Sequence, residues 1–534
     1  RSWKAKSLSA WGSCSRLGAC FMKRNFYCIT LIIIVSFSYI SCQRSQSGTD
    51  KSLTIGIETG PTNLDPRKSL DAISHKLTQL IFSSLVRIDE SLNIVPDIAQ
   101  SWESPDKQTY IFHLKRNVYY HNGVELTAED VKYTFDSMLD PNFKSPKAAT
   151  YEIIKEIHVL DPYAIKFSLK EPFAPFLTNM VMGIVPKDIA TSEGKKFETH
   201  PVGSGPFKFE RWLSDERVVL SGFDNYFAGK PKMDTLIFKI IPDDTVRIFE
   251  LKKGSIDLIQ NEIPPDMLTI LKREAKFNIE TAPGTNLSYL GFNLKDPILT
   301  NRLVREAIAH AINRKAIIEH ILGGFAQPAK NLLSPACWAY EPDVQTYPYD
   351  PDRSRSLLDL TGYEDPDGEG PQARFTMTYK TSQNDLSKRI AEVIQDDLGK
   401  VGIKVDLRSL EWGTFFSDIK SGNFQVYSLQ WVGITDPDIY YYLFHSQSIP
   451  PHGANRGHYI SPQIDWLIEE GRVTLDNQKR KEIYSQIQKL LAKDLPYVNL
   501  WHWDNIVIMK KNISGYTLFP SADYISLKDT EIKK

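Results

Sequence analysis

The sequence predicts an α/β protein whose chain forms more than one lobe, with a binding cleft between the lobes. The length of 534 residues exceeds what a single hydrophobic core normally supports. The hydrophobic content of 42% and charged content of 24% are typical of soluble globular proteins. Between Asn286 and Arg314, in the middle of the chain, a strand pattern leads directly into a helical pattern. We interpret this stretch as the passage from one lobe to the other.

The central stretch begins with an apolar, aromatic run over Leu287 to Asn293, which is typical of a buried strand. Asp296 and Pro297 end this run. Thr300 is then expected to cap a helix whose apolar residues recur on one face, and Asn313 to cap a second helix. The second helix is expected to stop at Gly323 and Gly324.

The N-terminal part of the sequence resembles an export signal. The first methionine is Met22, where we expect translation to begin, and two basic residues follow it. The apolar run from Phe26 to Ile40 is short for a membrane span, which needs about 20 residues, but is typical of a secretory signal. The run ends in Tyr-Ile-Ser-Cys, which is similar to a bacterial lipoprotein box with Cys42 as the lipidated residue. The alternative is an uncleaved N-terminal anchor.

Charge and cysteine usage narrow the class of protein. Residues 1–41 contain six basic and no acidic residues, so the remainder has 58 basic and 65 acidic residues and a net charge of −7. This charge argues against nucleic-acid binding, which needs a basic face. Cys42 and Cys337 are the cysteines of the remainder, and lipid on Cys42 would preclude an intramolecular disulfide. Residues 43–52 are polar and resemble a flexible tether.

The first half of the chain contains strand and helix patterns in alternation. Leu53 to Ile57 is a predicted strand, and apolar residues recur at helical spacing between Leu77 and Leu85. Thr127 and Asp130 are spaced as a capping box that opens a helix. Residues 156–160 and 163–169 flank an Asp-Pro pair as a hairpin. We therefore expect residues 85–195 to form a separate α+β subdomain.

The second half continues the α/β pattern. A glycine-punctuated loop over residues 201–207 precedes a strand, and Thr245 is expected to cap a helix that ends at Gly254. A helix over residues 386–394 leads into the strand Ile403 to Leu407, and a late helix covers residues 483–491. The last aromatic strand, Pro496 to Trp503, is where we expect the chain to cross back.

Eight blocks in this order resemble the extracytoplasmic solute-binding proteins of peptide ABC importers, the oligopeptide, dipeptide and nickel-binding family. The similarity covers nearly the whole chain after the export signal. The blocks are Pro96 to Trp102, Tyr110 to Val118, His121 to Gly123, Thr127 to Val131, Gly203 to Pro206, Leu290 to Asn293, Val304 to Arg314 and Tyr349 to Pro351.

The resemblance implies a two-lobed periplasmic-binding-protein type II fold with an extra α+β subdomain on the first lobe. It also implies that the protein captures short peptides between its lobes and delivers them to an ABC permease in the cytoplasmic membrane. We further expect a monomer without a cofactor, located in the periplasm and held at a membrane by lipid on Cys42. The expected parts are the signal (1–41), the tether (42–52), lobe I (53–84, 196–285 and 501–534), subdomain Ib (85–195) and lobe II (286–500).

The best candidate for ligand contacts is the stretch from Leu429 to Asp438, which contains Trp431. The resemblance implies strand-like backbone contacts here and an aspartate for the α-ammonium group of a peptide. Counting back from Pro437 puts Gly433 at the position of that aspartate, and counting on from Trp431 puts Ile434 there. Asp436 or Asp438 is a substitute for it, although Asp436 is also typical of a turn or a helix cap.

Further candidate ligand contacts lie elsewhere in the chain. Asp71 is another acidic group that is able to bind an ammonium. Trp412, Trp501 and Trp503 are expected either to stack on ligand side chains or to belong to the core, and the last two share one strand face. Arg456, in a loop rich in glycine and proline, either pairs with a ligand carboxylate in a fork geometry or is a solvated loop residue.

The sequence argues against catalytic and metal-binding classes. It contains no GxxxxGK, HExxH or CxxC motif, and Ser204 lacks the first glycine of a nucleophile elbow, so it is expected to be a turn residue. His445, His452 and His458 are not spaced as a metal set. A binding protein and not an enzyme is therefore predicted. The alternatives are the same scaffold holding a metal chelate, haem or glycopeptide, and a secreted hydrolase.

Overall fold

A mixed sheet of eleven strands runs through the described part of the computed structural model, which covers residues 51–261, 263–368 and 370–533. β1 pairs in parallel with β10, and β14 pairs in parallel with β15, whereas β12 and β17 are antiparallel. The predicted α/β class is confirmed. In spatial order the strands are β15 (Ile403–Leu410), β14 (Phe375–Ser382), β16 (Val426–Trp431), β12 (Phe277–Phe292), β17 (Tyr497–Lys510), β11 (Leu258–Gln260), β1 (Ser52–Ile57), β10 (Thr235–Ile240), β9 (Arg217–Gly222) and β8 (Phe207–Leu213), with β13 (Ala326–Pro328) also paired to β17.

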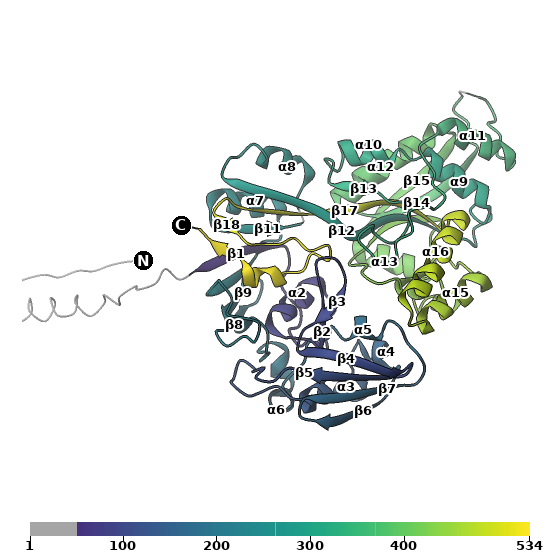
Figure 1. Cartoon of the computed structure of the whole chain (residues 1–534). Helices are drawn as coiled ribbons and strands as arrows, with labels where there is room; N and C mark the ends of the chain where they lie inside the picture. Colours follow the sequence, from purple (N-terminus) through teal and green to yellow (C-terminus); the bar gives the residue numbers. More distant parts are fainter. Residues whose placement is uncertain (1–50, 262, 369, 534) are drawn as a thin grey trace, which may run out of the picture. The chain divides into compact units, whose positions relative to one another are not determined.

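The long strands β12 and β17 run side by side through the middle of this sheet (Figure 1). Their register extends from Phe277 opposite Lys510 to Gly291 opposite Tyr497, with an irregularity between Pro283 and Leu287. β16 joins the sheet at one end of the pair and β11 at the other. The pair therefore carries the chain between two groups of strands. The sequence predicted only the second half of β12.

The hydrophobic core is divided into clusters that follow the sequence. The buried residues of the two clusters around β12, β14 and β16 all lie between residues 287 and 501. A third cluster draws all its buried residues from positions 85–184. The remaining two draw theirs from residues 53–82, 185–277 and 506–527, together with Phe325. The chain has several cores, as its length predicted.

A four-stranded antiparallel sheet forms within the residues expected to be the subdomain. The predicted hairpin is its β6–β7 pair. The helix α3 opens with the predicted capping box, since the Thr127 backbone N–H donates to Asp130 Oδ2 at 2.9 Å. The elements here are β2 (Val86–Ile88), β3 (Ile94–Pro96), β4 (Ala99–Asp106), β5 (Thr109–Leu114), α3 (Ala128–Leu139), α4 (Ala148–Tyr151), β6 (Ile154–Asp161), β7 (Ala164–Leu169), α5 (Phe176–Asn179), α6 (Lys187–Glu193) and η1 (Gly194–Glu198).

The remaining helices begin close to the positions that the sequence predicted. Asn313 caps α10 as expected, but Asn301, not Thr300, caps α9, and Asp243, not Thr245, caps α7. In both corrections the side chain that accepts the hydrogen bond is an Asn or Asp, a strong N-cap type. The elements are α2 (Ala72–Ile81), α7 (Asp244–Lys253), α8 (Pro265–Leu271), α9 (Arg302–Ala311), α10 (Arg314–His320), α11 (Pro351–Leu360), α12 (Asp385–Gly399), α13 (Trp412–Ser421), α14 (Ile439–Phe444), η2 (Ser446–Ser448), α15 (Pro462–Val473), α16 (Asn477–Asp494), β18 (Ile513–Ser514), η3 (Ile525–Asp529) and β19 (Glu531–Ile532).

The glycine loop before β8 has a structural role. A Cβ atom at Gly203 would lie 1.9 Å from the carbonyl oxygen of Ile81, so only glycine allows this close approach. The imidazole of His121 holds the loop: its Nε2 lies 3.0 Å from the Gly205 carbonyl oxygen, and the Gly203 N–H donates to its Nδ1 at 3.2 Å. Ser204 is fully buried and lies where the backbone of this loop bends, in agreement with its prediction as a turn residue.

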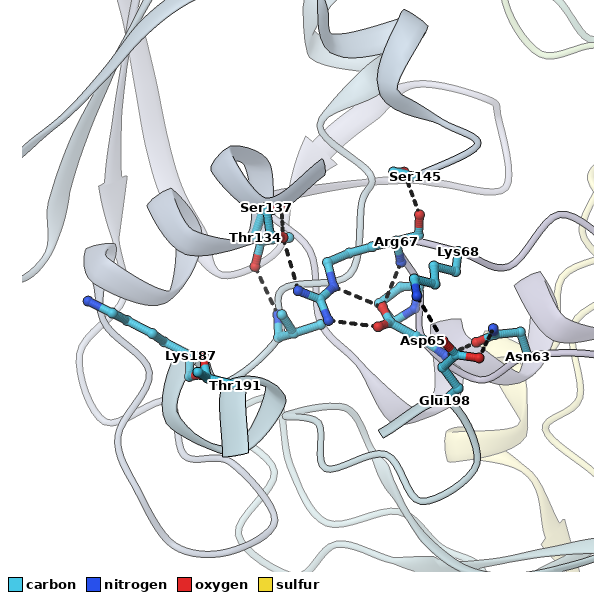
Figure 2. A network of polar contacts seen from close by, with 12 residues as sticks. Asn63, Asp65, Arg67, Lys68, Thr134, Ser137, Ser145, Lys187, Thr191 and Glu198 are labelled. Carbon is cyan, nitrogen blue, oxygen red and sulfur yellow. Dashed lines mark hydrogen bonds and ion pairs between the residues drawn. The ribbon is translucent and has the colours of Figure 1, made fainter. Parts of the chain in front are cut away.

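A buried ion pair ties the segment before α2 to the subdomain (Figure 2). The guanidinium of Arg67 binds both oxygens of Asp65 at 2.9 and 2.7 Å and donates to Ser137 of α3 at 2.9 Å. Beside it, Lys68 pairs with Glu198 at 2.8 Å. Both side chains of the Asp65–Arg67 pair are 2% exposed, so water screens their attraction little.

The predicted signal and the predicted lipidation site Cys42 lie outside the described residues. Cys337 is a buried free cysteine. Within residues 51–533, as far as they are described, no helix has the length and apolar character needed to cross a bilayer.

Candidate functional site

The predicted ligand-contacting stretch begins in β16, a strand that is hydrogen-bonded to a neighbour along only part of one side. On one side, all six residues of β16 pair with β12, from Val426 opposite Phe292 to Trp431 opposite Leu287. On the other side, β14 pairs only with Val426 and Tyr427. No described strand pairs with residues 428–431 on that side. Their backbone groups therefore present an edge that an extended chain is able to extend by one strand.

The loop after β16 is held against the crossing strand β12. The backbone N–H of Gly433 donates to Asn286 Oδ1 at 2.8 Å, and the N–H of Ile434 donates to the Thr285 carbonyl at 3.4 Å. Gly433 is exposed with a φ of +69°, a conformation that favours glycine. Ile434 is buried. Of the two positions at which the family resemblance suggested an aspartate, one is therefore exposed and the other faces the core.

Trp431 lies in a stack of aromatic side chains. Its ring is parallel to that of Tyr289, with centroids 5.8 Å apart and 6° between the planes, and meets Tyr442 edge-on at 6.4 Å. The carbon of the Arg456 guanidinium lies 4.8 Å from the Trp431 ring centroid. The indole N–H is buried and has no hydrogen-bond partner among the described residues.

Arg456 is part of this stack and is not a solvated loop residue. It is only 8% exposed. Its guanidinium donates to the Tyr289 hydroxyl at 3.1 Å and lies 5.4 Å from the ring centroid of Phe416. No carboxylate oxygen of the described residues lies within 4.0 Å of it, so Arg456 has no ion-pair partner there.

Trp412 extends the stack toward the solvent. It is the first residue of α13, it is 55% exposed, and its ring is parallel to that of Phe416 at 5.5 Å. We call Tyr289, Trp412, Phe416, Trp431, Tyr442 and Arg456 the aromatic–arginine cluster. The sequence analysis missed Phe416, although it follows Trp412 by four residues, a spacing that places two side chains on one helix face. Tyr289 and Tyr442 had no such marker.

The tyrosines around Arg456 are neutral. Burial raises the pKa of Tyr289 and of Tyr497 well above the usual value for a phenol. Tyr497 stacks on Tyr289 with centroids 4.3 Å apart. Tyr289 therefore gives the guanidinium a hydrogen-bond acceptor, but neither phenol gives it a compensating charge.

The acidic candidates Asp436 and Asp438 are both engaged with arginines. Asp436 Oδ1 accepts from Arg480 at 3.2 Å, and Asp438 Oδ1 accepts from Arg472 Nε at 2.9 Å. Burial, which outweighs the attraction of Arg472, raises the pKa of Asp438. The second oxygen of Asp436 accepts from Thr178 of α5 at 3.3 Å.

Arg472 links two regions that are far apart in sequence. The backbone N–H of Ala174 donates to the Arg472 carbonyl at 2.6 Å, and the Arg472 guanidinium lies 5.0 Å from the ring centroid of Phe173. Phe173 belongs to the subdomain cluster of residues 85–184, and Arg472 to α15. Together with the Thr178–Asp436 bond, these contacts join the two regions beside the candidate site.

Asp71 is placed as a helix cap. It precedes α2, its Oδ1 accepts from the Ser74 N–H at 2.8 Å, and its Oδ2 accepts from the hydroxyls of Ser74 and Thr62. Although burial acts in the opposite direction, these hydrogen bonds lower the pKa of Asp71. Both oxygens therefore already have donors within the chain.

The two tryptophans of β17 differ in burial. Trp501 is 1% exposed and belongs to the cluster of α9, α12 and their neighbours. Trp503 is partly buried, donates from Nε1 to Ser288 Oγ at 2.8 Å and meets Trp501 edge-on at 6.5 Å. The two tryptophans share one face of the strand, as the sequence predicted. Trp501 is a core residue.

His445, His452 and His458 do not form a group of metal ligands. His445 is buried and contacts Glu469 at 3.0 Å. No group of three or more potential metal ligands occurs in the described residues.

Comparisons with known proteins agree with this geometry. The family model of bacterial extracellular solute-binding proteins, family 5 (middle), matches residues 93–450. The chain is 31% identical over 510 residues to the oligopeptide-binding protein AppA of Bacillus subtilis, covering 91% of this chain and 92% of that protein. The structure of that AppA with a nonapeptide matches with a TM-score of 0.76 and 29% identity, over 90% of this chain and 99% of that one.

A relative with a different ligand matches as well. NikZ from Campylobacter jejuni, in complex with Ni(L-His), has a TM-score of 0.77 and 26% identity, over 91% of this chain and 100% of that one. The resemblance read from eight sequence blocks is confirmed, and so is the two-lobed type II fold with its additional subdomain. The chain belongs to family 5 of the bacterial extracellular solute-binding proteins.

Proposed function

We propose that this chain is the substrate-binding lipoprotein of an ABC importer, which captures short peptides between its lobes and delivers them to a permease of the cytoplasmic membrane. The observation that carries the proposal is the open edge of β16 at residues 428–431, beside the aromatic–arginine cluster. A peptide added there as a strand is held through its main chain, so many side-chain sequences are accepted. Trp412, Tyr442 and Val432 add exposed apolar surface for ligand side chains.

The proposed lobes are those that the sequence predicted. Lobe I consists of residues 53–84, 196–285 and 501–534, lobe II of residues 286–500, and residues 85–195 form subdomain Ib. The crossings near residues 286 and 500 fall within β12 and β17, and the irregular pairing of β12 after Pro283 favours bending there. We infer that the contacts of Ala174 and Thr178 with lobe II form when the lobes close.

The ligand side of the cleft is proposed to include Trp431, Gly433, Trp412, Trp503 and Arg456. The structure favours structural roles for the other candidates, because Ile434 and Trp501 are buried, and Asp71 and Asp436 already accept hydrogen bonds from within the chain. We propose that Cys42, which precedes the described residues, carries the lipid.

A second candidate ligand class is supported by one observation. The carboxylates of Asp436 and Asp438, which are the acidic groups of the candidate stretch, are paired with arginines. A non-peptide ligand such as a metal chelate does not need an ammonium anchor, and NikZ holds Ni(L-His) on the same fold. A hydrolase is disfavoured because the family consists of solute-binding proteins.

Native mass spectrometry of the protein purified without denaturation tests these proposals. A co-purified set of peptide masses supports the peptide receptor, and a single metal- or haem-containing mass supports the second class. Adding a mixture of short peptides is expected to raise the melting temperature with concentration, by mass action. A melting temperature that no peptide changes would reject the peptide proposal, and cleavage of the peptides would reject a receptor without catalysis.

A further inference from the structure

The guanidinium of Arg456 is a buried positive charge without a carboxylate partner among the described residues. Removing a charge from water costs several kcal/mol unless it is paired. Among the other buried arginines, Arg67 binds Asp65 and Arg480 binds Asp436. Arg305 also lacks a carboxylate partner, but it donates to four backbone carbonyls; Arg456 has neither kind of acceptor among the described residues. The environment of Arg456 therefore differs from that of these structural arginines.

The groups around Arg456 stabilise it only in part. The guanidinium donates to the Tyr289 hydroxyl and hydrogen-bonds the side chain of Tyr427, and the faces of Trp431 and Phe416 add cation–π attraction. Such attraction is weaker than that of a buried ion partner. The neighbouring phenols are uncharged, because burial raises the pKa of Tyr289 and Tyr497. The site retains a net positive charge that an anionic group would neutralise.

The acidic groups of the candidate stretch and of α13 are already engaged within the described part of the chain. Asp436 binds Arg480 and Thr178, and Asp438 binds Arg472. Asp418 of α13, the helix that carries Phe416, binds Lys380 at 2.8 Å. Gly433, one of the two positions at which the family resemblance suggested an aspartate, carries no side chain. An α-ammonium placed beside Trp431 would find neutral rings and a positive charge.

We propose that this site anchors its ligand through a carboxylate bound to Arg456 and does not require a free α-ammonium group. The ligands are extended, carboxylate-bearing peptides, and peptides with a blocked N-terminus are accepted as well as free ones. The carboxylate is either the C-terminus or an acidic side chain, because both present the same two oxygens to the guanidinium fork. This inference rests on the proposed function.

Calorimetric titration of the protein, first freed of co-purified ligand by mild denaturation and refolding, tests the inference. The probes are one neutral tetrapeptide in four forms (free, N-acetylated, C-amidated, and blocked at both ends) and a doubly blocked tetrapeptide with one glutamate. We expect N-acetylation to change the Kd less than threefold. We expect C-amidation of the neutral peptide to weaken binding about 10- to 100-fold, as for loss of a hydrogen-bonded charge. Restoration of affinity by the glutamate would assign the carboxylate to a side chain.

Variants locate the effect. Arg456→Met is expected to bind the free and amidated forms equally, and Arg456→Lys, which keeps the charge without the fork, to retain part of the preference. Arg408→Met is the matched control, since Arg408 lies on the exposed surface of β15 and pairs with Asp406. Melting curves check that each variant is folded. If Arg456→Met is unfolded, the Lys variant and the peptide series on the wild-type protein test whether Arg456 binds the carboxylate.

Each outcome decides between the two proposals. Loss of binding on N-acetylation, or a carboxylate preference that persists in the folded Met variant, would overturn the inference and leave the peptide receptor standing. Binding of no peptide in any form would reject the proposed function together with the inference. The expected pattern supports both.

Discussion

Protonation of His121 is expected to destabilise the fold at acidic pH. Both ring nitrogens are used by one neutral tautomer: Nδ1 accepts from the Gly203 N–H at 3.2 Å, and Nε2 donates to the Gly205 carbonyl at 3.0 Å. A proton on Nδ1 would remove the acceptor. Burial lowers the pKa of His121 to about 4, whereas in the unfolded chain it is about 6.5.

The direction and size of the effect follow from these two values. Between pH 6.5 and pH 4 the unfolded chain binds the proton and the folded chain does not, so the free energy of unfolding falls as the pH falls through this range. Above this range the contribution of His121 is fully present. At pH 5 the expected loss from His121 is about 2 kcal/mol relative to pH 8.

Urea unfolding at pH 8 and pH 5 measures this loss. His121→Gln keeps a donor and an acceptor but does not titrate, so its free energy of unfolding should fall less between the two pH values than that of the wild type, by about 2 kcal/mol. Part of the loss will remain, because burial also lowers the pKa of His502 to about 4. His200→Gln, at an exposed position, is the control and should behave as the wild type. Equal losses in His121→Gln and wild type would refute the reasoning.

Three further predictions concern the site and its support. Trp431→Ala should weaken ligand binding at least tenfold in calorimetry while the protein still melts cooperatively; unchanged affinity would remove Trp431 from the site. Arg67→Met leaves the 2% exposed carboxylate of Asp65 unpaired and should cost about 3–5 kcal/mol in urea unfolding; a cost below 1 kcal/mol would contradict the role of this pair. Thr178→Val removes the hydroxyl that Asp436 accepts and should favour the open form, so X-ray scattering with saturating ligand should show less compaction than in wild type; identical curves would count against closure at this contact.

Side-chain spacing along the chain was sufficient to predict the elements that local chemistry specifies. The capping box at Thr127, the cap at Asn313 and the helix stop at Gly254 all occur as predicted, because each depends on residues within four positions of one another. Eight short blocks in order were sufficient for the family. The caps of α7 and α9 were missed by one or two residues because neighbouring side chains of similar type compete for the same backbone N–H groups.

The extent of β12 and the environment of Arg456 were decided by tertiary structure. The first half of β12 contains a proline and a glycine, Pro283 and Gly284, and several exposed residues. It is a strand because β17, more than 200 positions further along the chain, supplies its hydrogen bonds. Arg456 lies in a polar, glycine-rich loop that a local reading places in water. It is buried because Tyr289, 167 positions away, and Phe416 of α13 pack against it. Composition and spacing thus determined the α/β class, several helix boundaries and the family. Contacts between distant segments decide which buried charge has no partner, and a local sequence pattern does not predict such contacts.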